Sequence, residues 1–165
     1  MIFKENMKEI NVVIEISYGS NIKYELDKAK GRLSIDRILH TSMVYPGNYG
    51  FIENTLAKDG DPLDVLVLSE YKFLPGCCVK VKPLGVIFME DEKGVDEKII
   101  AVVSDKIDRK SVGVNDIEDL PVQSIREIEH FFEHYKDLED GKYVKISGHD
   151  GVKAALDIID SYTLN

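Results

Sequence analysis

The sequence is poor in cysteine, in long apolar runs and in basic charge, and each scarcity excludes a class of protein. Its two cysteines, Cys77 and Cys78, are adjacent, which disfavours a structural disulfide and predicts a reducing, cytoplasmic setting. No apolar run reaches membrane-spanning length, and Met1–Glu5 does not begin a secretory leader, so we expect no membrane partner. With 21 basic against 30 acidic residues the net charge is −9, which argues against a nucleic-acid partner.

What is present indicates a globular protein. The chain has 165 residues, 44% of them hydrophobic, which predicts a single domain over residues 1–165. No internal repeat, low-complexity tract or linker interrupts it. A small anionic ligand remains compatible with the negative charge, because metal ions and a few local cations can neutralise such a ligand.

The pattern of the chain changes from strands to helices. Strands are expected at Val12–Ile16, at Val65–Leu68, as a hairpin of Ile22–Leu26 and Leu33–Leu39, as a strand pair within Val79–Met89, and at Ile99–Val103. A helix from about Val122 to about Leu138, a short strand at Val144–Ile146 and a closing helix at Val152–Tyr162 follow. This order predicts an α+β, mainly β domain with a closed or curled sheet and helices packed outside.

One acidic stretch dominates the chemistry: Asp59-Gly60-Asp61-Pro62-Leu63-Asp64. Pro62 favours an extended Asp61, and side chains two apart in an extended segment share a face. Crowded carboxylates are compensated by a hard divalent cation with oxygen ligands, so the stretch predicts a magnesium site. An ordinary solvated turn is the alternative. A calcium EF-hand is disfavoured, because Asp64 replaces the required glycine and the flanks resemble strands.

A second acidic segment follows Met89 and carries Asp91, Glu92, Asp96 and Glu97. Alone, such a run is typical of a solvated hairpin tip. If the curved sheet brings it over the first stretch, the two carboxylate clusters could hold two or more Mg²⁺ ions.

Several cationic and phenolic side chains complete the set. Each one has an ordinary interpretation as a surface or half-buried residue. Together with a carboxylate cluster, however, they are the groups that phosphoryl transfer to water requires. They are Lys23, Arg37, Tyr45, Tyr49, Lys98, Tyr135 and Lys136.

His130-Phe131-Phe132-Glu133-His134 matches the inverted zinc-protease pattern H-x-x-E-H. The match is short and lies close to the end of the sequence, so a packed or interface histidine pair is the favoured interpretation. At a subunit contact the pair would make assembly sensitive to pH.

Taken together, the ordered motifs resemble the soluble family I inorganic pyrophosphatases, of bacterial type. Asp59 to Val65 matches the signature D-x-D-P-x-D-x, and the resemblance runs from about Val12 to about Ile159. The other matching blocks are Lys23-Tyr24-Glu25, Asp36-Arg37, Tyr45 to Gly50, Asp91-Glu92 with Asp96 and Lys98, and His134 to Glu139. Ser17 departs from the family, which commonly has proline there, and this affects a loop rather than the chemistry.

The resemblance implies an OB-like five-stranded β-barrel with flanking α-helices, and Mg²⁺-dependent hydrolysis of inorganic pyrophosphate to two orthophosphates. It implies several Mg²⁺ per subunit and a homohexamer with His130 and His134 as subunit contacts. Asp61 would be the general base toward a metal-activated water, with Tyr49 and Arg37 also catalytic. The implied metal ligands are Asp59, Asp64, Asp91, Asp96, Glu15, Glu25 and Glu92. The implied substrate contacts are Lys23, Arg37, Tyr49, Lys98, Tyr135 and Lys136.

Two other functions are weighed against this one. A non-catalytic OB-type binding module is disfavoured, because nucleic-acid-binding barrels present basic grooves with stacking aromatics. A metal-dependent phosphatase acting on an organic pyrophosphate such as a nucleotide is disfavoured only by the resemblance. A comparison of pyrophosphate with ATP would distinguish it.

Overall fold

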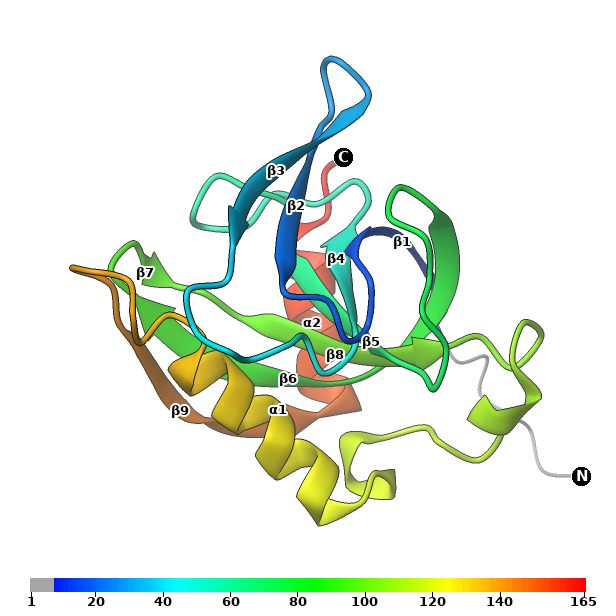
Figure 1. The fold of residues 1–165 in the computed structure, drawn as a ribbon. Coiled ribbons are helices and arrows are strands. Elements are labelled where there is room, and N and C mark those ends of the chain that lie inside the picture. The colour runs from blue at the N-terminus through cyan, green and yellow to red at the C-terminus, as the bar shows by residue number, and fades with distance from the viewer. Residues whose placement is uncertain (1–7) are drawn as a thin grey trace, which may run out of the picture.

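A ring of five strands forms the body of the computed structural model, which describes residues 8–165 (Figure 1). The strands follow the order β1 (Ile10–Ile16), β4 (Asn48–Ile52), β5 (Asp64–Leu68), β8 (Lys98–Val103) and β6 (Cys78–Asp91), and a β1–β6 pairing closes the ring. The β5–β8 pair is parallel and the other pairs in the ring are antiparallel. This arrangement confirms the predicted α+β, mainly β fold with a five-stranded OB-like barrel.

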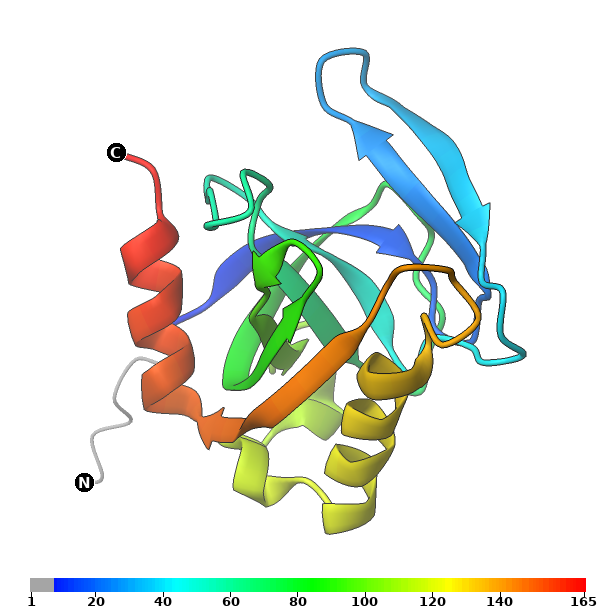
Figure 2. The ribbon, with the colours of Figure 1, turned by 90° about the vertical axis from the view of Figure 1, so that its left-hand side faces the viewer.

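The remaining elements surround the ring. Short β7 (Gly94–Val95) and longer β9 (Val144–Gly151) both pair with β6. A separate hairpin of β2 (Ile22–Asp27) and β3 (Arg32–Ile38) projects from one end of the molecule (Figures 1 and 2). The helices are η1 (Arg109–Ser111), η2 (Ile117–Asp119), α1 (Val122–His134) and α2 (Val152–Tyr162). Figure 2 shows α1 and α2 on either side of β9.

Alternation along the strands builds two hydrophobic clusters. In β5, Val65 and Val67 belong to the cluster that includes α2, whereas Leu66 belongs to the cluster that includes Phe131 and Phe132 of α1. Successive side chains of a strand point to opposite faces, so β-branched runs such as this one can bury both sides. The helices therefore cover the sheet, as the sequence predicted. Within residues 8–165, no helix is long and apolar enough to cross a membrane.

The expected strand pair within Val79–Met89 is wrong: the segment is one continuous strand, β6. Pro83 and Gly85 resemble turn residues, but here they flank a bulge opposite Ala101 and Ile100 that bends the strand. A Cβ on Gly85 would lie 2.5 Å from the Asp150 carbonyl oxygen, so only glycine allows β9 to approach this closely.

Other predicted boundaries also shift. Strand β4, which was not expected, begins inside the motif block Tyr45 to Gly50, and β9 extends five residues beyond Ile146 to Gly151. Helix α1 ends at His134 rather than near Leu138, and β6 continues into the predicted acidic loop as far as Asp91. A Cβ on Gly50 would lie 1.9 Å from the Val13 carbonyl oxygen, so the glycine of this motif permits the close β1–β4 pairing.

Candidate active site

A cavity of about 170 Å³ lies where the β2–β3 hairpin meets the ring. Its lining combines carboxylates, cations and tyrosines from segments that are far apart in sequence. Every metal ligand, catalytic residue and substrate contact that the family resemblance implies lines it: Glu15, Lys23, Glu25, Arg37, Tyr49, Asp59, Asp61, Asp64, Asp91, Glu92, Asp96, Lys98, Tyr135 and Lys136. The fold therefore brings the two acidic segments and the cationic set to one place.

Asp59 and Asp61 lie on the turn between β4 and β5. The expected extended geometry is wrong: residues 58–61 form a turn, with Gly60 at a φ of 86°. Asp59 Oδ1 accepts the Asp61 N–H at 3.0 Å. Both side chains still line the same cavity, because the turn, rather than strand alternation, brings them together.

Lys98 is the buried centre of the site. Its Nζ lies 2.7 Å from Asp64 Oδ2, 3.0 Å from Asp96 Oδ1 and 2.8 Å from the Tyr49 hydroxyl. The parallel pairing of β5 with β8 places Asp64 directly beside Lys98. Burial alone would lower the pKa of Lys98, but Asp64, Tyr49 and Asp96 raise it well above its usual value, so the side chain stays charged.

The carboxylates outnumber the cations that pair with them. Burial, with the nearby Asp64 and Glu25 charges, raises the pKa of Glu15 to about 7 despite a hydrogen bond from the Leu26 N–H. Burial and the Asp64 charge likewise raise the pKa of Asp96 to about 6 despite Lys98. Burial, Asp64 and Asp61 raise the pKa of Asp59. Such shifts mark carboxylates whose charge the protein alone does not compensate.

This donor set suits a hard cation, because it consists of carboxylate oxygens. In residues 8–165, however, no three acidic, histidine or cysteine side chains converge in a metal-binding geometry. Within the cavity, Asp64 and Asp96 both turn toward the Lys98 ammonium group, and for this reason they do not converge on a common metal position. The residues fit Mg²⁺ in chemistry and in charge.

Lys136 pairs with the acids at the end of β6. Its Nζ lies 3.3 Å from Asp91 Oδ2 and 3.6 Å from Glu92 Oε1. Burial raises the pKa of Asp91, but the Lys93 N–H and Lys136 more than offset that effect and hold it below its usual value. Asp91 is therefore ionised over the whole physiological pH range.

Arg37 is held by acids that sequence reasoning left without a role. Asp36 Oδ2 accepts from Arg37 Nε at 2.7 Å, and the buried Glu139 accepts from Arg37 Nη1. Lys142 Nζ donates to the same Glu139 oxygen at 3.0 Å. Further lining residues without a predicted role are Tyr24, Lys28, Lys93, Glu139 and Lys142. Glu139 and Tyr24 lie within matching motif blocks, which is the signal that could have indicated them.

Two aromatic candidates differ in position. Tyr135 lines the cavity, whereas Tyr45 is 1% exposed, packs against Phe131 in the core and does not line the cavity. Burial raises the pKa of both tyrosines. Tyr45 therefore supports the aromatic wall behind Tyr49 and Tyr135 rather than reaching a ligand.

Comparison with known proteins decides the family. Residues 12–164 match the family described as Inorganic pyrophosphatase. The inorganic pyrophosphatase of Sulfolobus acidocaldarius is 56% identical over 139 residues, covering 84% of this chain and 80% of that protein. The enzyme of Mesorhizobium japonicum is 51% identical over 160 residues, covering 96% and 90%. The chain belongs to the inorganic pyrophosphatase family.

Solved structures agree with this assignment. The inorganic pyrophosphatase of Helicobacter pylori superposes with a TM-score of 0.93 at 48% identity, covering 98% of this chain and 95% of that one. The enzyme of Thermus thermophilus gives 0.91 at 46% identity, covering 98% and 93%. These relatives confirm the family resemblance and the predicted enzyme class, inorganic diphosphatase.

The histidine motif of the sequence lies near the end of a helix in this pyrophosphatase fold. His130 and His134 lie on α1 with ring centroids 4.6 Å apart, and His134 Nδ1 lies 2.8 Å from Asp137. Within the described residues they belong to no metal-binding group, so the structure gives the zinc-protease interpretation no support.

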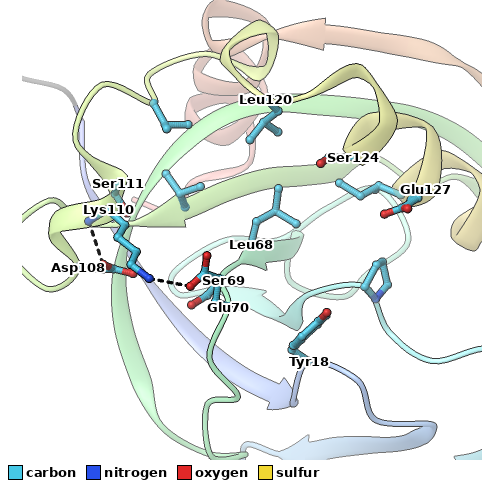
Figure 3. A pocket seen from close by; sticks show the side chains of 14 residues that line it. Tyr18, Leu68, Ser69, Glu70, Asp108, Lys110, Ser111, Leu120, Ser124 and Glu127 are labelled. Carbon is cyan, nitrogen blue, oxygen red and sulfur yellow. Dashed lines mark hydrogen bonds and ion pairs between the residues drawn. The ribbon is translucent and has the colours of Figure 1, made fainter.

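A second cavity, of about 420 Å³, shares no lining residue with the first (Figure 3). Leu68 and Leu120 point into it, and the single lysine of its lining, Lys110, lies with Nζ 2.7 Å from Glu70. Size therefore does not single out the candidate active site; its charge pattern does.

Proposed function

We propose that this protein hydrolyses inorganic pyrophosphate to two orthophosphates with Mg²⁺, using a metal-activated water and Asp61 as general base. The observation that carries the proposal is the lining of the small cavity, where uncompensated carboxylates face lysine, arginine and tyrosine donors. Family membership supports the same reaction. The cavity of about 170 Å³ is also smaller than the 300–1,000 Å³ or so typical of drug-sized ligands.

The carboxylate side of the cavity would hold the metal. Its members supply only oxygen ligands, which Mg²⁺ prefers. Burial, together with neighbouring carboxylates, raises the pKa values of Glu15, Asp59 and Asp96, and a bound cation would compensate the charge of their ionised forms. When bound, Mg²⁺ would lower the pKa of a coordinated water and neutralise phosphate oxygens. The proposed ligands are Asp59, Asp64, Asp91, Asp96, Glu15, Glu25 and Glu92.

Asp61 is suited to take a proton. It lies exposed on the turn, and no side chain within residues 8–165 forms a hydrogen bond or ion pair with its carboxylate. Asp59, by contrast, has an oxygen committed to the Asp61 N–H. A carboxylate free to reorient beside the metal ligands can accept a proton from the attacking water.

The donor side would bind the two phosphoryl groups. Lys98 Nζ donates to the Tyr49 hydroxyl, and Lys136 Nζ lies over the Tyr135 ring, 5.6 Å from its centroid. Charged donors held in a buried site stabilise negative charge on the departing phosphate without reorganisation. Lys23 and Arg37 extend this side along the β2–β3 hairpin, where Asp36 contacts both cations.

Assembly is part of the proposal. His130 is exposed and His134 half-buried on α1, so this part of the helix is available to a second subunit. We propose a homohexamer in which both histidines contact a neighbouring subunit. Sedimentation at pH 7.5 and pH 5.5 tests it, and a species of one mass at both pH values that is unaffected by His130→Ala would contradict the contact.

The reaction is tested by phosphate release from pyrophosphate with Mg²⁺, then with excess EDTA. Fast release that EDTA abolishes is expected. ATP in place of pyrophosphate tests the rival substrate, and release from ATP at a comparable rate would contradict the proposed specificity. A folded protein that releases no phosphate with Mg²⁺ would instead support the binding-module alternative.

A further inference from the structure

The last residue of α2, Tyr162, and the two residues after it contact both segments that carry the acidic side chains. Leu56 N–H donates to the Tyr162 carbonyl at 2.9 Å, and Leu164 N–H donates to the Asn54 carbonyl at 2.9 Å. The Asn54 side-chain amide donates to the Leu164 carbonyl at 3.1 Å. Together with a bridge between Thr55 and Thr163, these bonds form a short antiparallel pairing.

The paired segment leads directly into the first acidic turn. Ala57 N–H donates to the Asp61 carbonyl at 2.7 Å, so the turn is tied to the residue that follows the pairing. Thr55 is 5% exposed, and its hydroxyl accepts from Leu63 N–H at 3.0 Å while donating to the Ile52 carbonyl at 2.7 Å. The position of residues 54–56 therefore sets the position of the turn that carries Asp59 and Asp61.

The same part of the chain reaches the second acidic segment through one side chain. The Tyr162 hydroxyl donates to Glu97 Oε1 at 3.1 Å and to Oε2 at 3.0 Å. Glu97 lies between Asp96 and Lys98, which both line the cavity. Burial and the Glu97 hydrogen bond raise the pKa of Tyr162 to about 12, so the hydroxyl remains a donor at neutral pH.

We propose that Tyr162–Leu164 form a clasp, which fixes the turn carrying Asp59 and Asp61 relative to the segment carrying Asp96 and Lys98 at the start of β8. This clasp sets the affinity of the site for Mg²⁺. The inference rests on the proposed function, in which these acids hold the metal. Tyr162 and Leu164 are positioning residues, because neither lines the cavity.

The physical reason is the repulsion among the carboxylates. In the metal-free protein, like charges on the two segments favour separation of the segments. Helix α2 is anchored by Ala155 and Ile159, which are 0% and 2% exposed, so the clasp starts from a fixed support. Holding ligands in place before binding raises metal affinity without changing the chemical step.

Two variants each remove one contact. Tyr162→Phe deletes only the hydroxyl, and Tyr143→Phe, at a tyrosine that is 55% exposed, is its matched control. Leu164→Pro deletes the N–H that reaches Asn54, and Thr163, with φ −68° and ψ 129°, already has the backbone that a following proline requires. Leu164→Ala keeps that N–H and is the second control.

Calorimetric titration of the metal-free proteins with Mg²⁺, without substrate, measures the effect. Each of Tyr162→Phe and Leu164→Pro should weaken Mg²⁺ binding roughly three- to tenfold, the size expected for one hydrogen bond. At saturating Mg²⁺ their kcat should equal that of the wild type. Amide hydrogen exchange in the metal-free proteins should become faster at Ala57 in both variants, while both controls behave as wild type.

The outcomes separate the two proposals. If the wild type binds Mg²⁺ and both variants bind it equally well, the clasp is overturned and the proposed function stands. Lower kcat at saturating Mg²⁺ with unchanged Mg²⁺ affinity also overturns the clasp. If the wild type itself binds no Mg²⁺, the proposed function fails and the clasp fails with it as a determinant of metal affinity.

Discussion

Two buried lysines on neighbouring strands differ in the charged groups that surround them. Lys98 of β8 and Lys82 of β6 have side chains only 3% and 2% exposed, and each forms an ion pair. Lys82 Nζ lies 2.6 Å from Asp105 and donates to the Ser111 carbonyl at 2.8 Å and to Asn115 Oδ1 at 3.1 Å. Lys98 instead faces two carboxylates and a tyrosine inside the candidate active site.

The difference lies in what surrounds each pair. Lys82 holds the segment containing Ser111, which lines the larger cavity of Figure 3, and only one of its three polar partners, Asp105, carries a charge. Lys98 lies among more acids than it can neutralise, and the pKa of Asp96 remains raised to about 6 beside it. Burial and pairing are thus common to both lysines, and the uncompensated acidic charge around Lys98 distinguishes it from Lys82.

The largest expected effect is at Asp61. Asp61→Asn should lower kcat by roughly 10²- to 10⁴-fold, because it removes the proton acceptor while leaving the turn hydrogen bonds intact. Asp108→Asn is the matched control, since Asp108 lines the other cavity and an amide oxygen can still cap η1 there. Steady-state phosphate release measures both. Near-normal turnover of Asp61→Asn would contradict the assignment of the general base.

Replacing each lysine in turn by methionine tests the comparison between Lys98 and Lys82. Lys98→Met should lower kcat by roughly 10²- to 10³-fold, as expected for loss of one buried donor to the developing charge. Lys82→Met should leave kcat nearly unchanged but lower the free energy of unfolding by about 3–5 kcal/mol, because Asp105 loses its partner. Kinetics and urea unfolding measure the two effects. Equal loss of kcat in both variants would break the distinction.

The raised pKa of Glu15 makes the stability of the metal-free protein depend on pH. Its carboxyl has a pKa of about 7 when folded against 4.5 as its ordinary value. The folded state therefore retains a proton that the unfolded state releases, so this contribution is full below about pH 4.5 and is lost as pH rises to 7. Mg²⁺ should offset the loss.

Glu15→Gln tests that sign. The variant should be more stable than the metal-free wild type at pH 7.5 by about 3 kcal/mol and should match it near pH 4.5, since one pKa unit corresponds to 1.36 kcal/mol. Glu118→Gln, at an exposed position outside the cavity, is the control. Urea unfolding at both pH values gives the answer, and a destabilised Glu15→Gln at pH 7.5 would refute the argument.

The smallest expected effect is at Tyr49. Tyr49→Phe removes the hydroxyl that accepts from Lys98 at 2.8 Å, and kcat/KM should fall about tenfold, as for one hydrogen bond. The aromatic ring remains packed against Phe132 and Tyr45, so thermal stability should change little. A fall as large as that of Lys98→Met would mean that the hydroxyl contributes more than positioning of the lysine.

The sequence predicted most of the fold and the membership of the site, for identifiable reasons. The spacing of Asp59, Asp61 and Asp64 indicated that their carboxylates gather in one place, which they do through a turn rather than an extended segment, and Pro121 with the periodic Ile125 and Ile128 indicated α1. Pro83 misled because a bulged strand and a turn use the same residues. Strand β4 was missed because Asn48 and Gly50 are poor strand formers that the close β1–β4 contact tolerates.

The remaining features depend on contacts between distant segments. No local pattern tells that Lys82 and Lys98 are both buried, or that Glu139 reaches Arg37 across 102 positions of the chain. The same holds for Tyr162 and Glu97, which lie 65 positions apart. Local periodicity indicates which face is apolar, but the partner of a buried charge is set by the topology of the ring.

Calorimetric Mg²⁺ titration of Asp64→Asn beside Asp105→Asn tests the central claim most directly. Each variant removes the charge from the aspartate that pairs with one of the two buried lysines. If the cavity around Lys98 is the metal site, as proposed, Asp64→Asn should weaken Mg²⁺ binding by at least about tenfold, while Asp105→Asn should bind as the wild type does. Equal affinities in the two variants would contradict the assignment of the active site.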